Sequence, residues 1–137
     1  MAVTAQYTAQ PILEYAQGIT ADTSRTNPTN SVEITAGPNV AAGVGVGKRI
    51  NRIVIHATST TTNGMVRFWL SLDSGTTKRL ILEKGVPAIT ASGTLSAFRA
   101  EVPELVGLIL PGGTANKLYV STQNTETFNI IVESALL

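Results

Sequence analysis

The sequence predicts an all-β protein: an antiparallel sandwich of about eight strands, jelly-roll-like, with an extended N-terminal arm. Short runs rich in Val, Ile, Thr and aromatic residues recur at spacings of roughly 8–12 residues, separated by clusters of Gly, Pro, Asn and Ser. No segment carries the period of a convincing amphipathic helix. The length of 137 residues fits one domain. Several long connections between the runs favour a jelly roll over a plain meander.

The predicted strands are short, and two of them alternate clearly between apolar and polar positions. Their ranges are 32–36, 49–58, 65–73, 77–84, 86–90, 97–102, 106–110, 117–122 and 127–134. In the strand 49–58, Ile53, Ile55 and Ala57 are expected to face the core. In the strand 65–73, the even-numbered positions 66–72 face the core, which leaves Arg67 and Trp69 on the outer face. The Asp-Ser-Gly sequence at 73–75 predicts a hairpin turn into the next strand.

Residues 1–30 differ from the rest of the chain, so we predict an arm over 1–30 and a β-sandwich domain over 31–137. The arm is polar, rich in threonine and interrupted by proline and glycine, although a single helical turn over 12–17 is compatible with its sequence. An arm with few apolar contacts frays in a monomer. We therefore expect it to lie across a neighbouring subunit, with Ile12, Leu13 and Tyr15 as partner-binding residues.

The low content of charged residues indicates a protein that assembles with other protein. Only 14% of the residues are charged and the net charge is +1, whereas soluble domains have about 25% charged residues. The surface must then consist largely of Thr, Ser, Asn, Gln, Ala and Gly. Such a surface loses its water at little cost, which suits contacts between subunits.

The sequence is poor in the groups that catalysis and metal binding need. It has no Cys, one His (His56) and two Asp, and no Gly-x-Ser-x-Gly motif. The glycine-rich segment 42–49 lacks the first Gly and the final Ser or Thr of a phosphate-binding loop, and it precedes a strand instead of a helix. We expect no enzymatic activity, no catalytic or cofactor-binding residue, no metal site and no cofactor.

Neither nucleic acid nor membrane is an expected partner. The basic residues form two small clusters, at 48–52 and 78–79, without interleaved aromatic side chains. No apolar run approaches the roughly 20 residues that span a bilayer. The first fifteen residues have no basic region followed by an apolar run, so we expect no signal peptide and synthesis in a cytoplasm.

Trp69 is the residue that most suggests binding, because the alternation of its strand points it away from the core. An outward Trp anchors protein contacts or stacks on sugar rings. We predict Trp69, Arg67 and Ile81 as partner-binding residues, with Ile131 on the same kind of outward position. Two alternatives stay open: a second sheet or the N-terminal arm covers Trp69, or Trp69 is the platform of a carbohydrate-binding module.

The segment 49–137 resembles small virion proteins of tailed bacteriophages, of the capsid decoration (cement) type. The resemblance is carried by RINRIVIHATSTTTNGMVRFWLSLD, by VPAITASGT and by LYVSTQNTETFNIIVES. It implies a β-sandwich on the capsid exterior, commonly a trimer, made in the bacterial host cytoplasm. The implied partners are the major capsid protein and other copies of the chain. A tail, neck or baseplate component is the alternative, since composition and predicted fold suit both locations.

Overall fold

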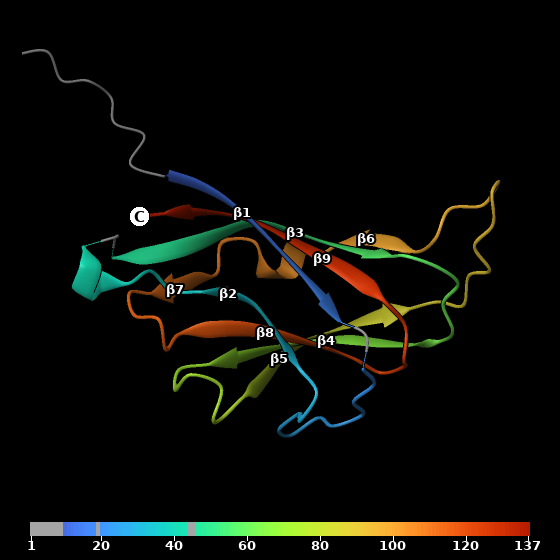
Figure 1. Cartoon of the computed structure of the whole chain (residues 1–137), viewed down its shortest axis with the longest axis horizontal. Coiled ribbons are helices and arrows are strands. Elements are labelled where there is room, and N and C mark those ends of the chain that lie inside the picture. The colour runs from blue at the N-terminus through green and yellow to red at the C-terminus, as the bar shows by residue number, and fades with distance from the viewer. Residues whose placement is uncertain (1–9, 19, 44–45) are drawn as a thin grey trace, which may run out of the picture.

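Two antiparallel sheets pack face to face in the computed structural model, which describes residues 10–18, 20–43 and 46–137 (Figure 1). The first sheet has the order β1-β9-β3-β6, with β7 also paired to β3, and the second has the order β2-β8-β4-β5. The strands of the first sheet are β1 (Gln10–Gly18), β3 (Gly47–Ala57), β6 (Arg99–Glu101), β7 (Ile109–Pro111) and β9 (Phe128–Leu136). Those of the second are β2 (Val32–Ala36), β4 (Gly64–Ser71), β5 (Arg79–Val86) and β8 (Lys117–Thr122). Two 3-10 turns, η1 (Val40–Ala42) and η2 (Pro103–Leu105), lie in connections.

The strand order is that of a jelly roll. β6 and β7 pair with opposite ends of β3, on the side that β9 leaves free, and together they occupy one strand position. With that position counted once, each connection crosses from one sheet to the other, except the β4–β5 hairpin. Eight strand positions in two four-stranded sheets connected in this way form a double Greek key. The predicted fold class, an antiparallel jelly-roll-like sandwich, is confirmed.

The core lies between the two sheets and follows the predicted alternation. Ile53, Ile55 and Ala57 of β3 are buried, and they pack in one cluster with Val66 and Phe68 of β4. The turn after β4 forms as predicted, because Gly75 adopts a φ of 89° that favours glycine. The predicted strand 86–90 is wrong: its second half makes one isolated bridge, Thr61 with Ile89. Pro87, which has no backbone N–H to donate to a ladder, and the Ser, Thr and Gly residues of 90–96 make this segment a connection.

The expected N-terminal arm contributes a strand to the sandwich. β1 pairs with β9 over nine residues without a register shift. Residues 12–17 are therefore part of a strand and form no helical turn. The sandwich also begins before residue 31, the predicted start of the domain. Ile12, Glu14 and Ala16 point inward and are half-buried. The polar Glu14 at an inward position obscures the strand period in the sequence. Residues 1–9 of the expected arm lie outside the described residues.

Candidate assembly surface

Trp69 and Arg67 lie on the outer face of β4, as the alternation predicts, but both are buried. Trp69 is 0% exposed, and its Nε1 donates to Ser121 Oγ at 2.9 Å. Arg67 is 3% exposed; its Nη1 donates to Asp22 O at 3.4 Å and its Nε lies 3.6 Å from Glu83 Oε1. The prediction of these two residues as partner-binding is therefore wrong. A buried Trp69 also cannot be the platform of a carbohydrate-binding module.

The cover over Trp69 comes from the connection between β1 and β2, residues 20–31. Its start is held by Asp22 N, which donates to Thr122 O at 2.8 Å. Its far part is held by Lys78, whose backbone N donates to Asn27 Oδ1 and whose Nζ donates to Pro28 O, both at 3.3 Å. Part of the expected arm thus lies across the outer face of the second sheet of its own chain. This is the alternative in which the N-terminal arm covers Trp69.

Ile81 is 37% exposed on β5, an edge strand of the second sheet. The register passes from Phe68–Leu82 to Trp69–Leu80, so Ile81 is the extra residue of a β-bulge. It lies on the second sheet, whereas the exposed predicted contact residues Leu13 and Tyr15 lie on β1 of the first sheet.

Leu13 and Tyr15 are the predicted partner-binding residues that the structure leaves most exposed. They are 70% and 84% exposed on the outer face of β1. Ile131 of β9, which is 37% exposed, lies opposite Tyr15 in the register. With Asn129 these side chains line one shallow hollow. We call Leu13, Tyr15 and Ile131 the β1–β9 patch; Ile12 points to the other side of β1 and does not belong to it.

The charges beside the β1–β9 patch are paired with one another. Arg52 of β3 bonds to Glu101 of β6, and its Nη1 lies 3.4 Å from Glu133 Oε1 of β9. The hydrogen bond from Arg52, followed by its positive charge, holds the pKa of Glu101 below its ordinary value. Exposed ion pairs of this kind contribute little to stability. The patch itself has no charged side chain, and the ion pairs partly cancel the charges of the side chains beside it.

The described residues contain no candidate metal centre. Within 10–18, 20–43 and 46–137, no group of three or more His, Asp or Glu side chains could hold a metal ion. His56 is exposed on the outer face of β3 and lies opposite Asn129 and Arg99 in the register, without a carboxylate at its side in that row. No helix of the described residues is long and apolar enough to cross a membrane.

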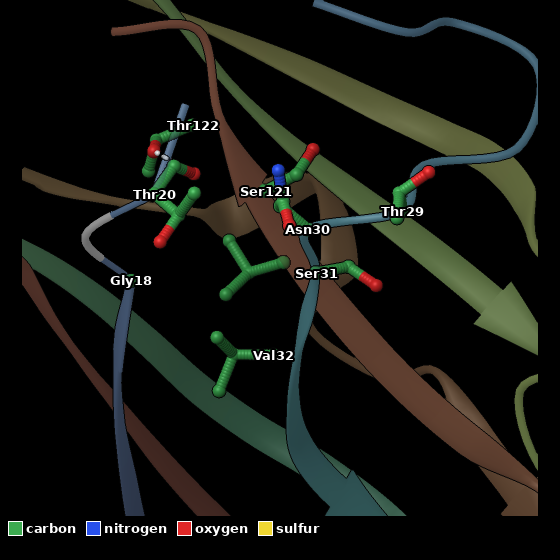
Figure 2. Close-up of a pocket in the computed structure, with 9 residues that line it drawn as sticks. Gly18, Thr20, Thr29, Asn30, Ser31, Val32, Ser121 and Thr122 are labelled. Atoms are coloured by element: carbon green, nitrogen blue, oxygen red, sulfur yellow. Dashed lines mark hydrogen bonds between the residues drawn. The ribbon is translucent and has the colours of Figure 1, made fainter. Parts of the chain in front are cut away.

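A small polar pocket opens between β1, β2 and β8 (Figure 2). It has a volume of about 220 Å³, and its side chains are hydroxyl, amide and valine groups without a charge. The lining residues are Gly18, Thr20, Thr29, Asn30, Ser31, Val32, Val120, Ser121 and Thr122. Ligand pockets usually have about 300–1,000 Å³. This pocket is below that range and has no charged side chain, so it does not change the assignment of the β1–β9 patch as the candidate site.

Comparison with known proteins gives a distant structural likeness. No protein-family model matches the chain, and no curated protein matches it. Two structures of infectious bursal disease virus, the T13 viral particle and the Gt strain, align at 10% identity and a TM-score of 0.38, covering 99% of this chain and 33% and 34% of theirs. The Gx strain aligns at 12% identity and a TM-score of 0.22, covering 98% and 42%. This chain thus spans about a third of the first two, and a likeness this distant does not bear on its function.

Proposed function

We propose that this protein is a non-enzymatic structural component of a virus particle that decorates and stabilises the capsid by binding the major capsid protein and other copies of itself. The observation that carries the proposal is the β1–β9 patch: Leu13 and Tyr15 are 70% and 84% exposed next to Ile131. Large apolar side chains gathered on the surface mark sites of contact with other proteins. The patch is uncharged, as protein interfaces are at their centre.

Three further features support a structural role on a particle. The chain has 14% charged residues, so much of its surface dehydrates at little cost. Jelly rolls recur in viral capsid domains, although they also occur in lectins, and a fold alone does not define a function. The sequence of 49–137 resembles capsid decoration proteins of tailed bacteriophages. Many weak contacts of identical copies with one shell would give durable binding through multivalency.

The second candidate is a tail, neck or baseplate component of such a particle, since the same patch would serve there. Purified source particles, separated into tail-less capsids and isolated tails, decide between the two by mass-spectrometric quantification of this protein. We expect many copies per capsid. Detection with the tails alone would support the second candidate, and absence from both fractions would refute a structural role in the virion.

Variants then test the patch. Leu13→Ser and Tyr15→Ser should weaken binding of the purified protein to capsids that lack it, because each removes apolar area that binding would bury. Leu72→Ser is the matched control, since Leu72 is 61% exposed and lies just after β4 of the other sheet. Equal binding of all three variants and the wild type would show that the patch does not contact the shell.

A further inference from the structure

Three of the four sheet edges are protected against pairing with another strand. β5 carries the bulge at Ile81, and β2 is five residues long with a register shift between Glu33 and Thr35. The edge beyond β3 is divided into β6 and β7, of three residues each. Bulges and short strands are among the devices by which proteins prevent edge-to-edge association, together with Pro and charged side chains on the edge.

The fourth edge, β1, is nine residues long and has no bulge, although Pro11 near its N-terminal end leaves one backbone position without a donor. In the described part of the chain β1 is hydrogen-bonded to β9 on one side, over nine residues with an unbroken register. Figure 1 shows its N-terminal end away from β2, whereas its C-terminal end approaches β2. Its one ionisable side chain other than Tyr15 is Glu14, which faces inward and bonds to Lys48 and Thr35 at 2.9 and 2.7 Å. The N-terminal half of this edge, which lies away from β2, therefore has no outward charge to repel a second strand.

We infer that β1 pairs antiparallel with β1 of a second copy about a two-fold axis, so that the two first sheets become continuous. A two-fold axis brings identical surfaces together, and it suits a strand whose outward side chains, Pro11, Leu13, Tyr15 and Gln17, are all uncharged. Main-chain hydrogen bonds supply the affinity of such an added strand, and side chains supply its register. This inference rests on the proposed function as a self-associating structural protein and names the partner surface.

The charges select the register of the pair. With the axis at Glu14, two carboxylates would lie directly opposite each other, which is destabilising. With the axis at Tyr15, the pair would use the C-terminal half of β1, where Gly18 and Val32 of β2 line one pocket. With the axis at Leu13, Leu13 lies opposite Leu13 of the second copy and Tyr15 lies opposite Pro11 of the second copy. That arrangement joins both β1–β9 patches into one apolar strip, and it produces dimers in place of the trimer that the resemblance implies.

Single cysteines test this register directly, because the chain has no native Cys. Paired residues of neighbouring strands have Cα atoms about 4.5–5.5 Å apart, within the range that a disulfide bridges. Leu13→Cys should give a covalent dimer under mild oxidation. Tyr15→Cys should not, because Tyr15 of the two copies would be four residues apart along the strand, about 13 Å. Leu72→Cys, on the other sheet, gives the background of random collisions.

Sedimentation velocity of the full chain over a concentration series measures the association itself. We expect a monomer–dimer equilibrium that Leu13→Lys abolishes and Leu72→Lys leaves unchanged, because a Lys on the outer face of an edge strand opposes pairing. A wild type that is monomeric or trimeric at every concentration overturns the inference. So does cross-linking of Leu13→Cys no higher than that of Leu72→Cys, and stronger cross-linking of Tyr15→Cys overturns the register.

The two proposals fail in different experiments. A chain that is abundant in capsids, but whose Leu13→Cys variant does not cross-link in solution or on particles, refutes the strand pairing and leaves the decoration role standing. A chain that cross-links through Leu13→Cys but is absent from particles refutes the decoration role and leaves the dimer standing.

Discussion

Replacing Lys48 by Met should destabilise the protein by about 2 kcal/mol, because it breaks a buried ion pair that holds β1 in the sandwich. Lys48 Nζ lies 2.9 Å from Glu14 Oε1 and 3.1 Å from Thr35 Oγ1, and the Thr35 hydroxyl donates to Glu14 Oε1 at 2.7 Å. The three residues belong to β3, β1 and β2, so the contact ties β1 to both sheets. Its loss leaves β1 held by its pairing with β9 and by half-buried apolar side chains.

The magnitude follows from how much of each charge is buried. Removing one partner of a fully buried pair costs about 3–5 kcal/mol, because the other charge stays without compensation. The Lys48 side chain is 8% exposed and that of Glu14 is 33% exposed, so Glu14 recovers hydration when Lys48 is absent and the cost falls to about 2 kcal/mol. Glu14→Gln should cost more, about 3 kcal/mol, because it leaves the ammonium group of Lys48 buried.

A double-mutant cycle separates this contact from other effects. The free energies of unfolding of the wild type, Lys48→Met, Glu14→Gln and the double variant are measured by urea titration, followed by the fluorescence of Trp69, the one Trp of the chain. We expect a coupling energy of about 1–2 kcal/mol, because the double variant leaves neither charge unpaired. Additivity within about 0.3–0.5 kcal/mol, or a larger cost for Lys48→Met than for Glu14→Gln, would refute the reasoning.

Three further predictions test the fold around this site. Trp69→Ala should cost about 3–5 kcal/mol by circular dichroism in urea, because it removes a fully buried ring and leaves Ser121 Oγ without its donor; an unchanged midpoint would contradict the buried position. Gly37→Ala should cost about 1–3 kcal/mol, since its Cβ would meet two carbonyl oxygens at the end of β7 and just after it, whereas Gly85→Ala, with open space, is the neutral control. Burial opposes ionisation of Asp22, but backbone N–H donors of the β1–β2 connection hold its pKa below 3.8. Its carboxylate thus adds stability that is full above about pH 5 and is lost as the pH falls through the lowered pKa, so Asp22→Asn should lose more stability at pH 7 than at pH 2.5 in urea titrations.

Strand alternation predicted which face a residue occupies more reliably than what covers that face. β2 and β8 have the predicted bounds, and the inward residues of β3 are buried. Trp69 also occupies the predicted outer face, yet it is fully buried, because residues 20–31 of the same chain lie over it. That cover depends on contacts between Asp22 and Thr122 and between Asn27 and Lys78, which are distant in sequence. No local period encodes them.

The strand β1 could not be recognised from its period for a related reason. Its inward positions hold Ile12, Glu14 and Ala16, and its outward positions include Leu13 and Tyr15, so the apolar residues fall on both faces. The carboxylate of Glu14 at an inward position is explained by its ion pair with Lys48, which is distant in sequence and adjacent in the fold. The exposure of Leu13 and Tyr15 was nevertheless predictable, because an arm that extends from its own domain does not bury them.

β1 thus contributes inward side chains to the sandwich interior and outward side chains to the β1–β9 patch. The ion pair between Glu14 and Lys48 links the two. Side chains alternate along a strand, so a slip of one residue against β9 would turn Leu13 and Tyr15 inward and Glu14 outward. The bonds of Glu14 to Lys48 and Thr35 oppose that slip. It follows that Lys48→Met should weaken self-association as well as folding, although Lys48 is buried and does not touch the β1–β9 patch. A variant that loses stability but pairs through Leu13 as strongly as the wild type would show that pairing with β9 alone fixes the register of β1.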